Sequence, residues 1–271
     1  MTFSRLFAKI TRGGVRRTAL GLLAVPLLMQ SCEPACTPAG PRTIEQRQIG
    51  TSVQGRPLIA YHVNPHPGQK VVLAIGNIHG DEQTGIEVVQ YIRDQATIPD
   101  NLDVWVIESI NPDGVVANTH VNGSGVDLNR NFDPDWRPNN CALNPRYCAG
   151  QGPRDQPESQ AIADFLLDVK PIMTAWYHGP LHVIDRALSF GVANPAVLDA
   201  YAAQVGYAVA TVNCSPTGIC VGNATQFGNY NIPGSSAFVI ELPTGAAGAL
   251  TDRGVQNHVN AFFAAAAAAV A

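Results

Sequence analysis

The sequence predicts one α/β domain with a mixed, mostly parallel central sheet flanked by helices. Its 271 residues, 46% of them hydrophobic, are enough to bury one sizeable core. Short apolar runs alternate with segments of helical periodicity, which is the pattern of an α/β fold. The runs are continuously apolar, as expected for strands that are buried on both faces of a sheet.

Five apolar runs predict strands, and four periodic segments predict helices. The strands are expected at Pro57–Val63, Val71–Ile75, Val104–Ile107, Met173–Trp176 and Ala237–Ile240. The helices are expected at Gly85–Gln95, Glu158–Val169, Pro195–Val205 and Asp252–Ala271. The last helix includes a run of alanines, the residue with the highest helix propensity.

Residues 1–31 have the layout of a secretory signal peptide. Basic residues precede the apolar segment Ala19–Met29, which is shorter than the roughly 20 residues that cross a bilayer. Residues 32–41 are expected to form a Pro-rich linker, and residues 42–271 the folded domain. We therefore expect an exported protein that is extracellular, periplasmic or attached to the cell envelope. Both general secretion and twin-arginine export remain open, as does lipidation of Cys32.

Charge is distributed unevenly along the chain. Five of the 17 Lys and Arg, and none of the 21 Asp and Glu, precede residue 32, so the remainder carries a formal charge of −9. An acidic chain without a basic stripe lacks the clustered cations that neutralise phosphates. Nucleic acid is therefore not expected as a partner, and membrane contact is expected only through a lipid on Cys32.

The cysteines of an exported chain are candidates for disulfides before they are candidates for metal ligands. Cys141 and Cys148 bracket one short loop, and Cys214 and Cys220 bracket another. We expect a disulfide across each loop, with four free, buried thiols as the alternative. The spacing does not resemble that of a zinc site.

Side chains capable of chemistry follow the predicted strands. His79 and Glu82 follow the second strand, His178 the fourth and Glu241 the fifth. Ligand sites in open α/β sheets lie beyond the carboxyl ends of the strands, so these four residues are expected at one edge. A His, Glu, His set with one open position is typical of a catalytic zinc ion, here one per chain. Glu241 would act as the general base for a zinc-activated water, which fits hydrolysis of an amide.

These residues resemble the zinc metallocarboxypeptidases of the carboxypeptidase A type. His79-x-x-Glu82 is similar to the paired ligands of that family, and His178 and Glu241 occupy the places of its third ligand and its catalytic Glu. Asn111-Pro-Asp-Gly114 and the segment Gly125–Phe132 are similar to two further motifs, in the same order along residues 50–245. The resemblance implies a zinc carboxypeptidase-like catalytic domain over residues 42–271. Within that family, the motifs and the length of the chain are most similar to those of short bacterial murein peptide amidases, which act on cell-wall peptides.

The resemblance assigns the recognition of a free substrate carboxylate to Asn129 and Arg130. A planar guanidinium binds a carboxylate through two parallel hydrogen bonds, which a Lys would not do. The alternative is that Arg130 forms a structural ion pair with Asp127 or Asp133.

The chain departs from the family at His120, where an Arg usually stabilises the oxyanion. Protonated His120 could replace that Arg in part, or Arg137 or Arg154 could reach the site from a loop; an exposed His120 without a role is the alternative. By the same resemblance, Tyr230 could donate a proton or hydrogen bond to the leaving group.

Three further histidines and one neighbouring pair complete the candidates. His182 and Asp185 follow His178 closely and could contact substrate or orient a ligand, with a structural role as the alternative. Surface or packing roles are expected for His62, His66 and His258.

Three functions remain open on these residues. The first is a zinc carboxypeptidase or amidase acting on a peptide or muropeptide next to a free carboxylate. The second is an N-acyl amino acid deacylase of the succinylglutamate desuccinylase or aspartoacylase type. The third is a catalytically weakened member that only binds peptides, suggested by the missing Arg.

Overall fold

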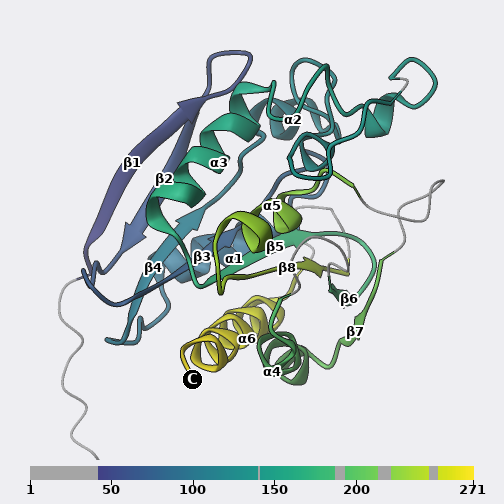
Figure 1. The fold of residues 1–271 in the computed structure, drawn as a ribbon. Helices are drawn as coiled ribbons and strands as arrows, with labels where there is room; N and C mark the ends of the chain where they lie inside the picture. The colour runs from purple at the N-terminus through teal and green to yellow at the C-terminus, as the bar shows by residue number, and fades with distance from the viewer. Residues whose placement is uncertain (1–41, 140, 187–192, 213–220, 244–249) are drawn as a thin grey trace, which may run out of the picture. The chain divides into compact units, whose positions relative to one another are not determined.

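An eight-stranded mixed sheet runs through the protein in a computed structural model that describes residues 42–139, 141–186, 193–212, 221–243 and 250–271 (Figure 1). The strands lie in the order β1-β2-β4-β3-β5-β8-β6-β7. Their bounds are β1 Ile44–Thr51, β2 Pro57–Val63, β3 Lys70–Ile75, β4 Leu102–Ile107, β5 Met173–His178, β6 Val183–Asp185, β7 Ala208–Ala210 and β8 Ser236–Glu241.

The middle of the sheet is parallel and its flanks are partly antiparallel. β4, β3, β5 and β8 pair in parallel, whereas β1 with β2, β2 with β4, and β6 with β8 pair antiparallel. The register places His178 of β5 directly beside Glu241 of β8. The predicted mixed, mostly parallel sheet is thereby confirmed, and it brings two of the candidate residues together.

Six helices of the described chain cover both faces of the sheet (Figure 1). On one face α6 contacts both α1 and α4, and on the other α3 contacts α5. Their bounds are α1 Thr84–Asp94, α2 Pro112–Ala117, α3 Pro157–Val169, α4 Pro195–Val205, α5 Ala224–Asn231 and α6 Asp252–Val270, with short 3₁₀ turns at Leu128–Arg130 and Pro145–Tyr147. The helix starts follow from local chemistry: Asn223 and Gln226 form a capping box on α5, and Pro157 and Pro195 occupy first turns.

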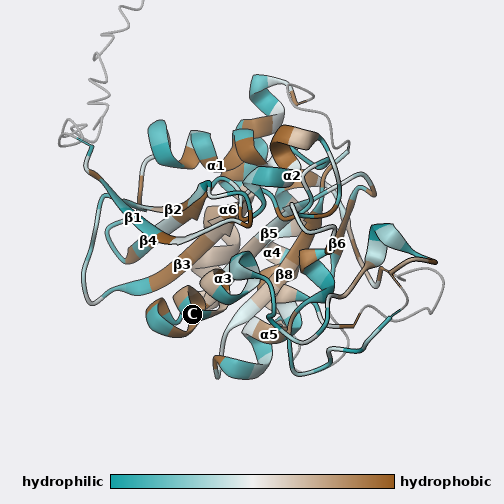
Figure 2. Ribbon diagram, turned by 90° about the horizontal axis from the view of Figure 1, so that it is seen from above, coloured by the Kyte–Doolittle hydropathy of each residue, from teal (hydrophilic) through white to brown (hydrophobic). Residues whose placement is uncertain are grey.

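Each face of the sheet has its own hydrophobic core. Val88, Val89 and Ile92 of α1 pack with Phe262 of α6 in one core, and Phe165 of α3 packs in the other. Figure 2 shows apolar strands at the centre of the sheet and a mostly polar β1 at its edge. The four predicted helices and five predicted strands are all present, within one or two residues at most ends.

Five elements were not predicted: β1, β6, β7, α2 and α5. β1 is exposed along most of its length and has almost no apolar periodicity, so its pairing with β2 leaves no pattern in the sequence. β6 and β7 have three residues each, which is too short for a period to show. α2 and α5 are short helices that begin at Asn caps rather than at amphipathic stripes.

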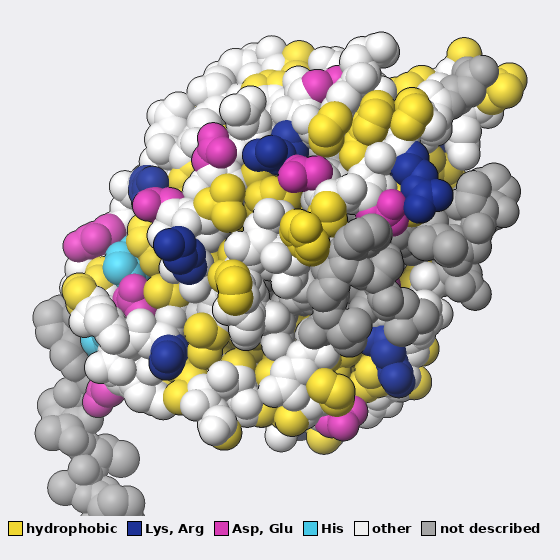
Figure 3. Space-filling model, in the orientation of Figure 1, with side chains coloured by type: hydrophobic (Ala, Val, Ile, Leu, Met, Phe, Trp, Pro, Cys, Tyr) yellow, Lys and Arg dark blue, Asp and Glu magenta, His cyan; other side chains and the backbone are white. Residues whose placement is uncertain are grey.

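The exterior carries charges of both signs. On the face in Figure 3, basic side chains lie singly among acidic and apolar ones, with no basic stripe. No helix in the described ranges has both the length and the hydrophobicity needed to span a bilayer.

His258 of α6 is buried among the rings of Tyr177, Tyr201 and Tyr207. Its Nδ1 lies 2.9 Å from the hydroxyl of Tyr201, and its Nε2 lies 3.3 Å from that of Tyr207. Burial disfavours the charged imidazole, and the charge of His182 adds to this, which lowers the pKa of His258 to about 4. The predicted packing role of this residue is therefore confirmed.

We expect the protonation of His258 to lower the free energy of unfolding as the pH falls below 6.5. The unfolded imidazole titrates near 6.5, so the unfolded state binds more protons between pH 6.5 and 4, and stability present above pH 6.5 is lost as the pH falls. The loss should be about 2 to 3 kcal/mol between pH 7 and 4.5. Urea unfolding at both pH values should show this part of the pH dependence vanish in His258→Gln but persist in the control His66→Gln. An equal pH dependence in both variants would contradict the assignment.

Candidate active site

A cavity of about 270 Å³ opens beyond the carboxyl ends of β3, β5 and β8. The strands and the segments that follow them supply its polar lining, as expected for an open α/β sheet. The lining includes His79, Glu82, His120, Asn129, Arg130, Arg146, Tyr147, His178, Asp185 and Glu241. The structure thus brings together eight of the residues singled out in the sequence and adds Arg146 and Tyr147.

His79, Glu82 and His178 form a convergent donor set at the floor of the cavity. Glu82 Oε2 lies 2.9 Å from His79 Nδ1 and 3.1 Å from His178 Nδ1, and one ligand atom from each residue falls within 4.8 Å of the others. All three side chains are buried. Two imidazoles and one carboxylate are donors that zinc prefers, so this set fits a zinc ion.

The carboxylates around His79 favour a positive charge at its imidazole. Its Nε2 lies 3.1 Å from Asp127 Oδ1, so the ring bridges two buried carboxylates, Glu82 and Asp127. Burial opposes protonation, but these carboxylates outweigh it and raise the pKa of His79 to about 10. A carboxylate behind a ligating imidazole is the usual outer support of a metal site, and a bound cation would supply the charge that the proton otherwise supplies.

Two asparagines hold the loop that carries His79 and Glu82. Asn77 donates a hydrogen bond to the backbone oxygen of Glu82 at 3.0 Å. Asn111 donates to the backbone oxygen of Ile78 at 3.0 Å and accepts from Gly114 at 2.9 Å, so the turn that starts α2 supports the metal-ligand loop. The predicted turn motif is a scaffold for the site and does not line the cavity.

Gly80 lies against the backbone of Gly114, with no room for a side chain: a Cβ at position 80 would overlap the carbonyl of Gly114. We expect Gly80→Ala to reduce the free energy of unfolding by about 3 kcal/mol and to weaken zinc binding, because residue 80 lies between two of the candidate metal donors, His79 and Glu82. Chemical denaturation and metal titration would measure both effects. Gly152→Ala is the control, since a Cβ there meets no atom within 4 Å. Equal stability of the two variants would contradict the close contact.

Glu241 lies at the end of β8, beside His178, with its side chain buried. Its Oε2 accepts no hydrogen bond from any residue that the structure describes. Burial and then the charge of Glu82 raise the pKa of Glu241 to about 8, and a bound cation would lower it again. A carboxylate in this range is suited to take and return a proton near neutral pH.

Asn129 and Arg130 lie on the 3₁₀ turn that forms another wall of the cavity. Asn129 accepts a hydrogen bond from the backbone of Ala224 at the start of α5, at 3.0 Å, which orients its amide. The guanidinium of Arg130 lies 5.6 Å from the ring centre of Tyr147. Of the two carboxylates considered as structural partners, Asp133 pairs with Arg154 at 2.6 Å. Asp127 is influenced by Arg130: burial acts to raise the pKa of Asp127, but the charges of Arg130 and then His79 lower it.

His120 is buried in the cavity wall, so the alternative of an exposed loop residue is wrong. Its ring stacks on that of His79 with 3.6 Å between centroids, and its Nδ1 lies 3.2 Å from Asp81 Oδ1. Arg146 pairs with the second oxygen of the same carboxylate, Asp81 Oδ2, at 2.8 Å. One carboxylate therefore holds His120 and Arg146 side by side.

The expectation that Arg137 or Arg154 reaches the site is wrong. Arg137 pairs with Asp135 and Arg154 with Asp133, and neither lines the cavity. Arg146 reaches it instead because the loop between the paired cysteines folds back over the site. The bracketing cysteines and Asp81, adjacent to the candidate metal donor Glu82, were the sequence features that could have indicated this.

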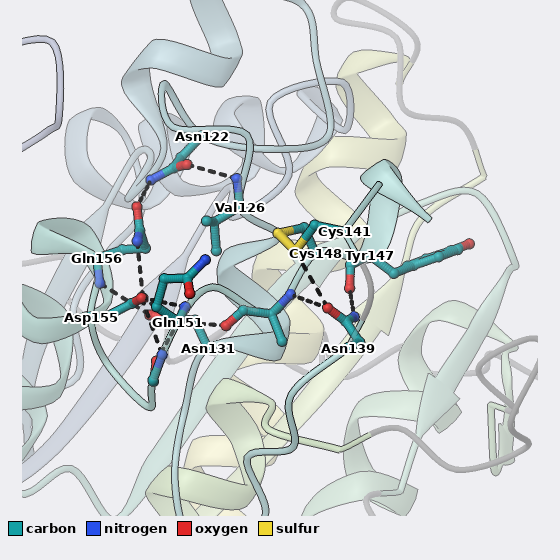
Figure 4. Close-up of a disulfide and its surroundings, with 12 residues drawn as sticks. Asn122, Val126, Asn131, Asn139, Cys141, Tyr147, Cys148, Gln151, Asp155 and Gln156 are labelled. Carbon is teal, nitrogen blue, oxygen red and sulfur yellow. Dashed lines mark hydrogen bonds between the residues drawn. A yellow bond between two sulfur atoms is a disulfide. The ribbon is translucent and has the colours of Figure 1, made fainter. Parts of the chain in front are cut away.

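The predicted disulfide between Cys141 and Cys148 is present and closes the loop that carries Arg146 and Tyr147 (Figure 4). Asn139 fastens the loop further, since it accepts from the backbone of Ala149 at 2.9 Å and donates to the backbone oxygen of Tyr147. Cys214 and Cys220 lie outside the described residues.

The structure does not bring Tyr230 into the lining of the cavity. It lies on the last turn of α5 with more than half of its surface exposed, and it is not among the residues that line the cavity. The capping box fixes the start of α5 at Ala224 and so directs Tyr230 outward. Of the neighbouring pair, Asp185 lines the cavity, whereas His182 is exposed and contacts Tyr207.

Comparison with known proteins places this geometry among metallopeptidases. A family profile described as zinc carboxypeptidase matches residues 36–184. Carboxypeptidase SOL1 of Arabidopsis thaliana is 34% identical over 146 residues, covering 48% of this chain and 28% of the relative. Murein peptide amidase A of Escherichia coli is 30% identical over 146 residues, covering 50% of this chain and 60% of the relative. The matches thus span less than two thirds of either curated relative.

Solved structures share the fold at low sequence identity. Murein-tripeptide amidase MpaA from Escherichia coli O157 superposes with a TM-score of 0.59 at 22% identity, covering 82% of this chain and 90% of that one. Carboxypeptidase A from Helicoverpa armigera superposes with a TM-score of 0.68 at 16% identity, covering 83% of this chain and 68% of that one. The predicted single-domain architecture is therefore that of known peptidases.

Proposed function

Because this chain belongs to the zinc carboxypeptidase family, we propose that it is a zinc-dependent hydrolase that cleaves an amide bond next to a free carboxylate. In this proposal His79, Glu82 and His178 hold one zinc ion, Glu241 is the general base, and Arg130 with Asn129 binds the carboxylate. The observation that carries the proposal is their convergence on one cavity at the strand ends.

Each of the proposed site residues has a distinct role in this reaction. When bound, zinc lowers the pKa of a coordinated water and polarises the substrate carbonyl. Arg130 fixes the free carboxylate through a forked pair of hydrogen bonds, which sets the position of the scissile bond. Glu241 accepts the proton of the attacking water and then delivers it to the leaving amine.

The substrate class in this proposal is a peptide or muropeptide, with cell-wall peptides favoured. The support is the likeness to murein peptide amidase A, which reaches 30% identity over half of the chain. We also propose that the chain is exported, which its N-terminal segment suggests and its Cys141–Cys148 disulfide suits, because disulfides persist mainly in oxidising compartments.

Metal analysis and a substrate panel would test the proposal. The purified full-length chain should contain about one zinc ion and should release products from dipeptides with a free carboxyl terminus and from muropeptides. Cleavage of N-acyl amino acids alone would favour the deacylase, and bound zinc without turnover on any substrate would favour the peptide-binding member. Absence of zinc would contradict the proposal outright.

A further inference from the structure

The cavity contains a second guanidinium to which the proposed function gives no role. Among the described residues, Arg130 and Arg146 are the only Lys or Arg side chains that line the cavity. The internal segments outside the description contain no Lys or Arg in their sequence. If Arg130 holds the substrate carboxylate, Arg146 is the remaining permanent positive charge in the cavity wall.

Arg146 is held in place from two directions. It lies within the loop closed by the Cys141–Cys148 disulfide, and its Nη1 lies 2.8 Å from Asp81 Oδ2. This ion pair uses one nitrogen of a side chain that offers five N–H donors in a planar fork. The residue is half exposed, at 49% of its side-chain surface, so its guanidinium can contact a ligand in the cavity.

Asp81, the ion-pair partner of Arg146, lies close to the candidate metal donors. Asp81 Oδ1 lies 3.2 Å from Nδ1 of His120, whose ring stacks on His79 and whose Nδ1 is 3.8 Å from Glu82 Oε1. Asp81 therefore links Arg146 to the floor of the cavity through a single carboxylate. Asp81 is a positioning residue in this arrangement.

Hydrolysis places negative charge on one oxygen. The water oxygen forms a bond to the carbonyl carbon, the π pair moves onto the carbonyl oxygen, and the proton of the water passes to Glu241. When the C–N bond breaks, that pair returns to the carbon–oxygen bond and the amine leaves with the proton from Glu241. A fixed donor aimed at the charged oxygen lowers the barrier more than it strengthens substrate binding.

We propose that Arg146 donates a hydrogen bond to the carbonyl oxygen as this negative charge develops. The inference rests on the proposed function and assigns the step to a loop residue held by Asp81 and the disulfide. A guanidinium suits the role because it remains charged at every working pH, whereas an imidazole such as His120 is charged only when protonated.

Steady-state kinetics and inhibitor binding on the full-length zinc-loaded protein would test it. Arg146→Gln should lower kcat by roughly 10- to 100-fold with KM changed by less than about 3-fold, and Arg146→Lys should lose less. Affinity for a phosphinic peptide, which mimics the tetrahedral state, should fall in parallel with kcat/KM, while affinity for the product carboxylate should stay unchanged. Arg137→Gln is the matched control, because Arg137 pairs with Asp135 outside the cavity.

The result that overturns the inference differs from the result that overturns the function. Unchanged kcat and phosphinic peptide affinity in Arg146→Gln, with an active wild type, would remove Arg146 from the reaction and leave the proposed function intact. A rise in KM alone would assign Arg146 to ground-state binding, and an equal loss in Arg137→Gln would indicate a nonspecific charge effect; both contradict the inference. An inactive wild type overturns both proposals. Zinc content and melting temperature of each variant show that fold and metal site are preserved.

Discussion

Glu241→Gln is expected to lower kcat by roughly 10²- to 10⁴-fold while zinc remains bound. The substitution keeps the size of the side chain and removes the group that accepts the proton. Glu241 is not one of the three converging metal donors, so the metal content should equal that of the wild type. The side chain is buried and its Oε2 has no hydrogen-bond partner among the described residues, so a neutral amide should not destabilise the fold. Turnover of a free-acid dipeptide, together with metal analysis, would measure both quantities.

Glu158 offers a matched control for this substitution. It is a buried glutamate outside the cavity that accepts hydrogen bonds from Val53 and Asn122. Glu158→Gln should alter stability by about 1 kcal/mol and leave kcat nearly unchanged. Full activity of Glu241→Gln would rule out its role as general base, whereas equal losses in both variants would point to a general effect of buried carboxylates.

Arg130→Lys should lower kcat/KM for free-acid substrates by roughly 10²-fold although the charge is kept. The loss comes from the second hydrogen bond of the guanidinium fork, which an ammonium on a flexible stem cannot reproduce. Hydrolysis of paired substrates that end in a carboxylate or in a carboxamide would isolate this interaction.

The acid and amide substrates form a double-mutant cycle with Arg130. Wild type should prefer the acid strongly, and the preference should nearly disappear in Arg130→Lys. Arg137→Lys, with its guanidinium outside the cavity, should keep the full preference. If Arg130→Lys also keeps it, the carboxylate is bound elsewhere and Arg146 becomes the first alternative.

The core of the fold was predictable because its strands and long helices carry strong patterns. β3, β5 and β8 are apolar runs buried on both faces, and α3 and α6 have clear amphipathic faces, so the order of apolar and polar residues locates them. β1 could not be located in this way. Its stability comes from backbone pairing with β2 and from the packing of α3, neither of which leaves a hydrophobic period.

The candidate metal donors at the floor of the cavity were predictable for a related reason, whereas Arg146 in its wall was not. His178 and Glu241 end buried strands, and His79 and Glu82 lie in the loop between β3 and α1, so the parallel sheet fixes where they meet. Arg146 depends on how a loop folds over the sheet, which is decided by a disulfide and by contacts with Asp81 and Asn139. The disulfide could be predicted from the spacing of the cysteines, but Arg146 and Asp81 are 65 residues apart, and neither periodicity nor motif spacing can detect their ion pair.

The floor and the wall of the cavity are supported by different parts of the fold, and this affects which of them can be altered by substitution. The metal ligands are built on strand ends and on a loop that packs tightly against Gly114, so substitutions there disturb the fold itself. The loop that the Cys141–Cys148 disulfide closes (Figure 4) instead contributes Arg146 and Tyr147 to the cavity wall. Exchanging this loop for one of other composition would therefore change both the cavity wall and the donor that we propose for the charged oxygen, whereas His79, Glu82 and His178 lie outside the exchanged segment.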